Sequence, residues 1–399
     1  MITALIRGLC CLLLVWASAA QADGAVVAIG GALKDDNTAV WSRVVQLAGG
    51  PGARFVVLAT ASGDPERAAT QIAANLQRQG ALATHLRSSD DEPTGLALLA
   101  QAQGVFFSGG EQARLLDLLQ PRGQAAPWLT AMRALLARGG VVAGTSAGAA
   151  VLSHTMFRDA PDVFGALLTP LREGLEIDRG FALVPADVVV DQHFLKRGRI
   201  GRLLPLLLHK GVRFGLGVEE DSAAVIRGHD VQAIGARGVL VIDTAAATRD
   251  AAAGAFNVRG VQLTYLAAGD RVSLLQQNIE PAAGKAAMKL HDRAAAPTST
   301  LTLAPTQAPW SFSDMLGDGV VLQAMSQLVR GGAAQVTGLA LRADSELGFE
   351  WLLVRDASTR AWAGRGSVDD TLAGITLSVA PVRVQQPLTT PWRAAQPPP

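Results

Sequence analysis

The sequence predicts an α/β fold, in which a parallel sheet lies between two layers of helices. Short apolar runs alternate with amphipathic stretches from residue 25 to about residue 228, and this alternation is typical of a sheet covered on both faces. The 399 residues and the hydrophobic content of 49% allow one large domain and a smaller one. In such sheets ligands bind beyond the carboxyl ends of the strands, so residues that follow the apolar runs are the first candidates for a functional site.

The elements of this domain are expected in regular alternation. We expect strands at the apolar runs 25–31, 54–60, 104–107, 141–144, 186–191, 213–219 and 223–228. We expect helices at the amphipathic stretches 38–47, 65–80, 111–119, 128–138 and 199–209.

The chain changes character after about residue 277. Residues 278–309 include the stretch "DRAAAPTSTLTLAPTQAP", which is rich in Pro, Ala, Thr and Ser and predicts a linker. Residues 310–399 predict a smaller α+β segment, with a helix at 314–329 and strands at 336–341 and 349–354. We see no catalytic constellation in this C-terminal segment, and its function is not predicted. The large domain is therefore expected to span residues 23–277.

The first 22 residues have the pattern of a signal peptide. Arg7 precedes an apolar run from Leu9 to about Trp16, and small residues end the segment at Ala20-Gln21-Ala22. A transmembrane anchor is the alternative, but the run is shorter than the about 20 residues that a span requires. We expect cleavage after Ala22 and a periplasmic or secreted protein.

Composition excludes several classes of function. The two cysteines, Cys10 and Cys11, both lie in the predicted signal peptide, so the mature chain would have no disulfide, thiol nucleophile or thiolate metal site. Lys and Arg number 35 against 34 Asp and Glu, for a net charge of +1. Nothing global therefore attracts nucleic acid or an anionic membrane, and we expect neither as a partner.

A candidate nucleophile lies in "VVAGTSAGAAVL", residues 141–152. Ser146 follows an apolar run and sits in Gly-Thr-Ser-Ala-Gly, a pattern typical of a nucleophile elbow, where small residues allow a sharp turn into a helix. A tight packing turn in an alanine-rich protein is the alternative. The backbone N–H of Ala147 and that of Gly110, in "VFFSGGEQARLL", are candidate oxyanion donors. Gln112, at the start of the next helix, is placed to reach a substrate, although a plain strand-to-helix junction is an equal alternative there.

A serine nucleophile requires a base and a carboxylate. Of six histidines, His193 follows a strand-like run, whereas His154 lies eight residues after Ser146 and is expected to be structural. Glu219 and Glu220 end another apolar run. Neighbours in an extended chain point to opposite faces, so at most one glutamate faces His193, and spacing alone does not choose between them.

Three arginines follow His193 within ten residues. Arg199 and Arg202 share one face of the expected helix, and Arg197 lies in the preceding loop. Guanidinium groups bind carboxylates through paired hydrogen bonds, so this set favours a substrate that carries carboxylates. A solvated basic start to the helix is the alternative.

Together "FFSGGEQ", "GTSAGA", "DQHF", "RGRIGRL" and "GVEEDSA", in this order, resemble the cyanophycinase branch of the S51 serine peptidases over residues 24–277. The resemblance implies a fold similar to class I glutamine amidotransferases, with a Ser146–His193–Glu220 triad. It also implies a substrate pocket, formed by Gln112, Asp191, Gln192, Arg197, Arg199 and Arg202. A homodimer is expected from the resemblance alone.

The resemblance also implies the substrate. Cyanophycin is an aspartate backbone with an arginine joined to each β-carboxyl group, so each unit has a free carboxylate and a guanidinium. We expect a serine exopeptidase that needs no metal or cofactor and releases β-aspartyl-arginine dipeptides, with Asp191 and nearby acids meeting the guanidinium. The alternatives are a peptidase of other aspartyl or isoaspartyl peptides and an inactive homologue that binds acidic peptides. Two features depart from the family, the export signal and the segment after about residue 278.

Overall fold

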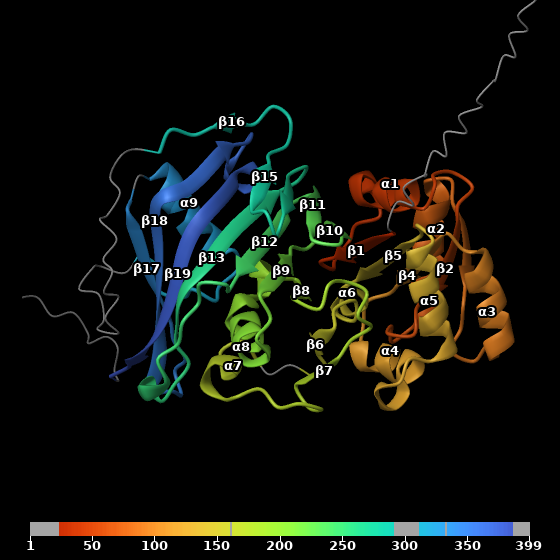
Figure 1. Ribbon diagram of the computed structural model, residues 1–399, viewed down its shortest axis with the longest axis horizontal. Helices are drawn as coiled ribbons and strands as arrows, with labels where there is room; N and C mark the ends of the chain where they lie inside the picture. The colour runs from red at the N-terminus through yellow and green to blue at the C-terminus, as the bar shows by residue number, and fades with distance from the viewer. Residues whose placement is uncertain (1–23, 160–161, 291–310, 332, 386–399) are drawn as a thin grey trace, which may run out of the picture.

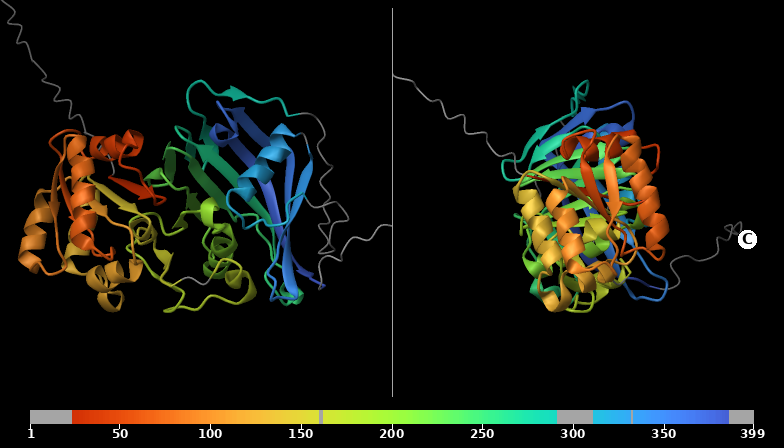
Figure 2. Two further views of the ribbon diagram at one scale, coloured as in Figure 1. Left: turned by 180° about the vertical axis from the view of Figure 1, so that it is seen from behind. Right: turned by 90° about the vertical axis from the view of Figure 1, so that its right-hand side faces the viewer.

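A computed structural model describes residues 24–159, 162–290, 311–331 and 333–385 of the protein (Figure 1). The predicted signal peptide, residues 1–22, lies outside the described residues, as do most of the predicted linker and the proline-rich end. Two large sheets dominate the described chain: the red-to-yellow strands belong to the first, the blue strands belong to the second, and green strands occur in both (Figure 2).

The first sheet has nine strands, in the order β15-β14-β11-β10-β1-β5-β4-β2-β3. Five of them are parallel: β1 (Ala25–Ile29), β2 (Arg54–Leu58), β3 (Leu82–His85), β4 (Gly104–Phe107) and β5 (Val141–Thr145). The remaining four continue the sheet as antiparallel neighbours: β10 (Ser222–Arg227), β11 (Asp230–Gly235), β14 (Arg271–Ser273) and β15 (Asn278–Glu280). The predicted α/β class is confirmed, and the sheet is mixed rather than wholly parallel.

Helices cover both faces of the parallel strands. On one face α1 (Thr38–Leu47) and α2 (Pro65–Arg78) pack on the side chains of Val27, Ile29 and Val57. On the other face lie α3 (Glu92–Gln101), α4 (Gln112–Leu119) and α5 (Pro127–Ala137). The side chains of Asn37, Asp64 and Asp91 cap the first turns of α1, α2 and α3 by accepting backbone N–H bonds. Successive side chains of a strand point to opposite faces of the sheet. These strands are apolar at nearly every position, so both layers of helices pack on an apolar surface.

The second sheet contains strands that the sequence placed in the first. Its order is β16-β18-β19-β13-β12-β9-β8, with β17 paired to β18. The parallel pair β8 (Val188–Gln192) and β9 (Phe214–Val218) was expected beside the N-terminal strands and instead forms one edge of this sheet. The other members are β12 (Gly238–Asp243), β13 (Val258–Ala267), β16 (Ala286–Ala287), β17 (Gln335–Ala340), β18 (Leu347–Ala363) and β19 (Thr371–Arg383).

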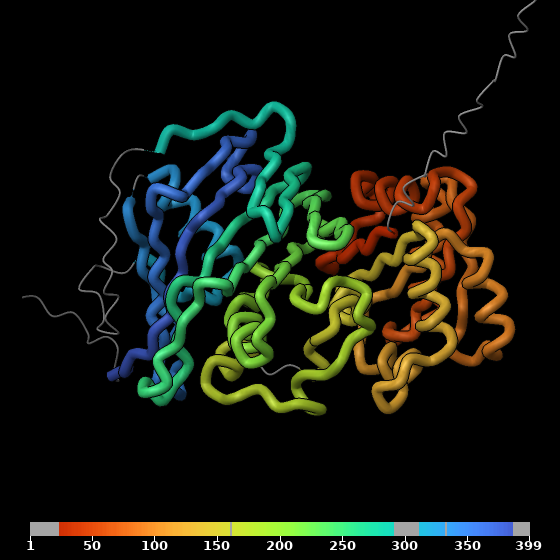
Figure 3. The backbone as a smooth tube through the Cα atoms, viewed as in Figure 1, coloured from red at the N-terminus to blue at the C-terminus, as the bar shows by residue number. Residues whose placement is uncertain are grey.

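The second sheet packs on helices with one face and, at its β8–β12 edge, on the first sheet with the other. One face packs on α7 (Gly165–Leu168), α8 (Ile200–Lys210) and α9 (Val320–Arg330). The other joins the apolar core of the first sheet, where β8, β9 and β12 contribute side chains beside those of β10 and β11. Between the two sheets lie α6 (Ala147–Ala150) and the two-stranded sheet of β6 (Thr155–Phe157) and β7 (Ile177–Arg179). Figure 3 shows this yellow-green stretch of chain between the two halves.

The C-terminal strands belong to this second sheet. Strand β19 pairs with β13, which the sequence assigned to the large domain, and β18 pairs with β19. Residues of the predicted linker form β15 and β16, and its residues 291–309 lie outside the described chain. The division of the chain at residues 277 and 310 stays a prediction. Main-chain hydrogen bonds between β13 and β19 join the large domain to the C-terminal segment.

No helix of the described chain is long and apolar enough to cross a membrane.

Candidate active site

Ser146 sits at a sharp turn between β5 and α6, as predicted for a nucleophile elbow. Its backbone has φ 53° and ψ −113°, which is strained for a residue with a side chain. A Cβ on Gly144 would lie 2.1 Å from the carbonyl oxygen of Gly148, and one on Gly148 would lie 2.7 Å from that of Phe107. The two glycines of Gly-Thr-Ser-Ala-Gly are therefore required sterically, because the turn brings backbone against backbone.

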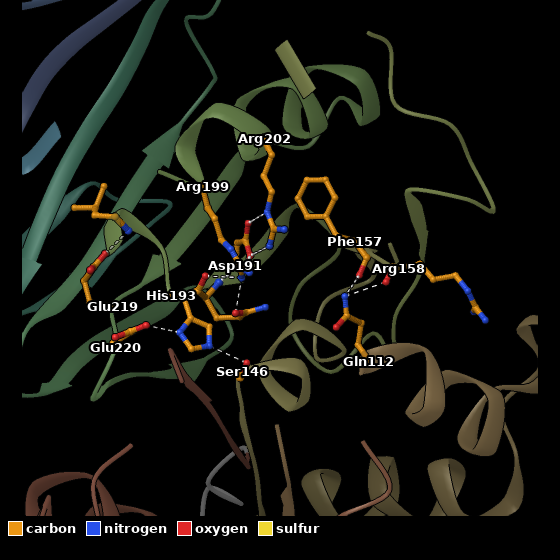
Figure 4. Close-up of polar contacts among 12 residues, drawn as sticks. Gln112, Ser146, Phe157, Arg158, Asp191, His193, Arg199, Arg202, Glu219 and Glu220 are labelled. Carbon is orange, nitrogen blue, oxygen red and sulfur yellow. Dashed lines mark hydrogen bonds and ion pairs between the residues drawn. The ribbon is translucent and has the colours of Figure 1, made fainter. Parts of the chain in front are cut away.

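Ser146, His193 and Glu220 form one hydrogen-bonded series (Figure 4). His193 follows β8, and its Nε2 lies 2.9 Å from Ser146 Oγ, while its Nδ1 lies 2.7 Å from Glu220 Oε1. A carboxylate accepts the Nδ1–H bond, so Nε2 is the unprotonated nitrogen and accepts the serine hydroxyl proton. This arrangement can move a proton from serine to imidazole and stabilise the resulting imidazolium.

The two adjacent glutamates have different surroundings. Glu220 points at His193, whereas Glu219 is buried and its Oε1 accepts a 2.8 Å bond from the N–H of Leu195. Burial raises the pKa of Glu219 to about 7, and the Leu195 bond only partly opposes it. The alternation expected from the sequence thus sends Glu220 to the histidine and Glu219 to the loop that follows it.

The imidazole of His193 is held in its neutral form. Burial lowers its pKa below 6.5, the bond to Glu220 opposes this, and the positive charges of Arg197 and Arg199 lower the pKa further. A neutral imidazole at neutral pH can accept a proton from Ser146.

Backbone donors lie beside the serine. A Cβ on Gly109 would lie 3.2 Å from Ser146 Cβ, so this loop runs next to the elbow. Gly110 has φ +135°, and a Cβ there would lie 1.9 Å from the carbonyl oxygen of Ala61. Within the described chain, the N–H groups of Gly110 and Ala147 have no backbone or side-chain acceptor. Two free N–H groups near a serine Oγ can bind an oxyanion.

The predicted substrate residues Asp191 and Arg202 bind each other. Asp191, only 1% exposed, accepts a 2.8 Å bond from Nε of Arg202 and a second bond from its Nη2. The Arg202 guanidinium also lies 4.5 Å over the ring of Phe157. This buried ion pair holds β8 against α8. Substrate contact by Asp191 and Arg202 stays a prediction.

The other predicted pocket residues are partly engaged. Arg199 donates a 2.9 Å bond to the carbonyl of Gln192 and lies 3.6 Å from Asp191, and burial together with the charge of Arg202 lowers its pKa to about 10. Gln192 is buried and its Oε1 accepts from Arg199. Arg197 is exposed and has no carboxylate within 4 Å in the described part of the chain. One carboxylate thus faces two guanidinium groups, and Arg197 adds a third positive charge close to His193.

Gln112 lies at the start of α4, as expected, and faces the loop after β6. Its Nε2 donates bonds of 3.1 and 3.0 Å to the carbonyls of Phe157 and Arg158. The amide nitrogen of Gln112 is therefore bonded to the main chain of this loop (Figure 4), and substrate contact by Gln112 stays a prediction.

Gly30 and Gly31 are site residues whose contribution the sequence did not reveal. The carbonyl of Gly30 accepts a 2.7 Å bond from the N–H of His193. A Cβ on Gly31, which has φ +95°, would lie 2.2 Å from Nε2 of His193. Gly31 makes room for the imidazole, and Gly30 makes room for the backbone of Glu219. The position of both glycines at a strand end was the available indication.

No metal site accompanies these groups in the described chain, where no three His, Cys, Asp or Glu side chains are grouped to hold an ion.

The sequence profile of peptidase family S51 matches residues 26–234. The chain belongs to peptidase family S51. It is 36% identical over 194 residues to a cyanophycinase of Trichormus variabilis, covering 47% of this chain and 62% of that protein. It is 31% identical over 226 residues to a cyanophycinase of Thermosynechococcus vestitus, covering 55% of this chain and 67% of that protein. The chain thus spans less than two thirds of the length of the Trichormus relative.

Two solved structures are also similar to this S51 chain. One is a peptidase from an acI-B1 Actinobacterium, with 22% identity and a TM-score of 0.45, covering 55% of this chain and 91% of that one. The other is a putative peptidase E protein from Listeria monocytogenes, with 16% identity and a TM-score of 0.39, covering 54% of this chain and all of that one.

A segment beyond the S51 match packs on the loop that carries the candidate arginines. The N–H of Gly319 donates a 3.1 Å bond to the carbonyl of Leu195, and Lys196 forms an ion pair with Asp318. A Cβ on Gly198, which has φ +58°, would lie 2.1 Å from the carbonyl oxygen of Leu316. The C-terminal segment is therefore part of the support of the 193–199 loop.

Proposed function

We propose that this S51 chain is a serine exopeptidase that hydrolyses cyanophycin and releases β-aspartyl-arginine dipeptides. The observation that carries the proposal is the hydrogen-bonded series from Ser146 through His193 to Glu220, with two free backbone N–H groups beside the serine. The similarity to proteins named cyanophycinase supports the choice of substrate.

The proposed reaction is acyl transfer to Ser146. His193 accepts the hydroxyl proton as Oγ attacks a carbonyl carbon of the aspartate backbone, and the N–H groups of Gly110 and Ala147 bind the oxyanion. The imidazolium then donates this proton to the leaving amine as the C–N bond breaks. Water, deprotonated by the same imidazole, hydrolyses the acyl ester and restores the serine.

The charge around His193 supports a substrate that carries carboxylates. Asp191 compensates Arg202, so Arg199 and Arg197 leave an excess of positive charge on the same loop. In this proposal, the α-carboxylate of an arginyl group binds the excess positive charge of Arg199 and Arg197. The proposed setting is the periplasm or the exterior, where the enzyme would degrade polymer that the cell does not itself store.

A serine-directed fluorophosphonate and insoluble cyanophycin test the proposal together. We expect the reagent to label wild type and the exposed-serine control Ser89→Ala, and to leave Ser146→Ala unlabelled. We expect soluble β-aspartyl-arginine, identified by mass spectrometry, from the same two proteins. A folded wild type that is not labelled would refute the enzyme and favour a binding homologue. Labelling with cleavage of α- or β-aspartyl dipeptides alone would refute cyanophycin as the substrate.

A further inference from the structure

A second polar cavity lies away from the serine, on the antiparallel extension of the first sheet. It has a volume of about 430 Å³ and is walled by Arg43 of α1 and by residues of β10, β11, β14 and β15. Helix α1 packs beside this extension in the upper part of the molecule (Figure 1).

Strand register places the charged side chains of this cavity on one face. Arg227 of β10 lies opposite Asp230 of β11, and Arg271 of β14 lies opposite Glu280 of β15. Gln232 lies opposite Arg271, two residues after Asp230. Residues two apart in a strand share a face, so both acid–arginine pairs and the glutamine line the same side of the sheet.

The three arginines, Arg43, Arg227 and Arg271, form no ion pair within the described chain. None of them has a carboxylate within 4 Å, although Asp230 and Glu280 line the same cavity. Arg43 is partly buried, and burial together with the charges of Arg227 and Arg271 lowers its pKa. Three arginines against two carboxylates leave the cavity with an excess of positive charge, and a ligand that carries carboxylates would bind that excess.

The cavity and the serine lie at opposite ends of one strand. Strand β10 begins at Ser222, two residues after Glu220, and ends at Arg227. Five residues of strand rise about 17 Å. At the near end, Asn37 of the α1 N-terminus binds Asp221 through its side-chain amide, so α1 and β10 connect the two sites. The cavity is therefore separate from the reacting atoms. The separation along β10, about 17 Å, is short enough for one polymer chain to reach both sites.

We propose that this arginine cavity is a second binding site for the same polymer, occupied by units that are not being cleaved. The α-carboxylates of those units bind Arg43, Arg227 and Arg271, and their guanidinium groups bind Asp230 and Glu280. The inference rests on the substrate assigned under the proposed function. Such a site retains the enzyme on insoluble polymer between cleavages by raising the effective concentration of the next chain.

Co-sedimentation with insoluble cyanophycin measures this binding without turnover. In a Ser146→Ala background we expect the variant Arg43→Gln/Arg227→Gln/Arg271→Gln to bind with a dissociation constant at least tenfold higher. The matched control is Arg122→Gln, an exposed arginine on another surface, which should bind like the parent. Because Arg227 and Arg271 are exposed, their double variant should keep the melting temperature of the parent and still show a several-fold loss.

Activity on a short soluble substrate separates this inference from the proposed function. With Ser146 restored, we expect the triple variant to cleave a two-unit oligomer with kcat/KM within about twofold of wild type. Equal sedimentation of the triple variant and the control would overturn the second site, as would a parent that does not sediment. The two claims can also fail separately. If wild type hydrolyses neither cyanophycin nor the oligomer, the proposed reaction is overturned. The second site is still supported in that case if the Ser146→Ala parent sediments with the polymer and its triple variant does not.

Discussion

Replacing Glu219 by glutamine should change the stability of the protein, and replacing Glu220 by glutamine should change its turnover, because only Glu220 binds the imidazole. Glu220 Oε1 accepts from His193 Nδ1 at 2.7 Å, and Glu219 Oε1 accepts from the N–H of Leu195 at 2.8 Å. Glutamine keeps the size of either side chain and can still accept one hydrogen bond. The substitution therefore removes the charge and little else.

The expected effect at Glu219 is on stability. Its pKa of about 7 lies roughly 2.5 pH units above the ordinary 4.5, which corresponds to about 3 kcal/mol. Because the folded pKa is raised, the folded state binds the extra proton between these values, and stability falls as pH rises from 4.5 through 7. Glu219→Gln has no such loss, so its unfolding free energy minus that of wild type should increase by up to about 3 kcal/mol between pH 4.5 and pH 8.

The expected effect at Glu220 is on turnover. A neutral amide cannot stabilise the imidazolium of His193 and can favour the wrong tautomer, which costs on the order of 10²–10⁴ in kcat. Urea unfolding at pH 4.5, 6 and 8 measures the first effect, and kcat on cyanophycin at pH 8 measures the second. A Glu219 variant that loses 10²-fold or more beside a nearly normal Glu220 variant would refute the assigned relay. A difference in unfolding free energy that does not change with pH would refute the buried-acid argument.

Three further predictions concern the loop and the strand before it. Arg197→Gln removes a positive charge near the imidazole, so the acid limb of the pH profile of kcat/KM should move to higher pH, and an unmoved limb would contradict the charge argument. Gly198→Ala should lower the melting temperature more than its matched control Gly211→Ala. Both glycines have positive φ, but only at Gly198 would the added Cβ meet a backbone oxygen. Equal losses would contradict a close contact between Gly198 and Leu316. Asp191→Asn leaves the Arg202 charge buried and should cost about 3–5 kcal/mol of unfolding free energy, whereas adding Arg202→Met should recover part of it; no recovery would contradict the pairing.

The local elements were predictable because their determinants are local. Helix α1 was expected at 38–47 and is found there, with Asn37 as its cap. The elbow was predictable because its tight turn has no space for a side chain at residues 144 and 148, and the sequence has glycine at both positions.

Long-range pairing was not predictable in the same way. The run "VVVDQ" of β8 is buried on both faces in whichever sheet it joins, so its pattern carries no information about its neighbour. Arg202 and Asp191 lie eleven residues apart, and their types indicate charge recognition without saying whether the partner is internal or a substrate. Residue type predicts that a guanidinium binds a carboxylate, and only the fold decides which one.

His193 itself shows why the second sheet matters to the first. Its φ of +46° is a strained conformation that persists only where the surroundings over-determine it. On one side, the carbonyl of Gly30 in the parallel sheet accepts the His193 N–H bond, and on the other side Gly319 and Leu316 of the C-terminal segment hold the loop at Leu195 and Gly198. The imidazole is therefore positioned by contacts from both halves of the chain, one inside the S51 match and one outside it. Loss of either set of contacts would release the strain by moving the histidine, so the C-terminal segment contributes to the geometry of the relay although it supplies no reacting group.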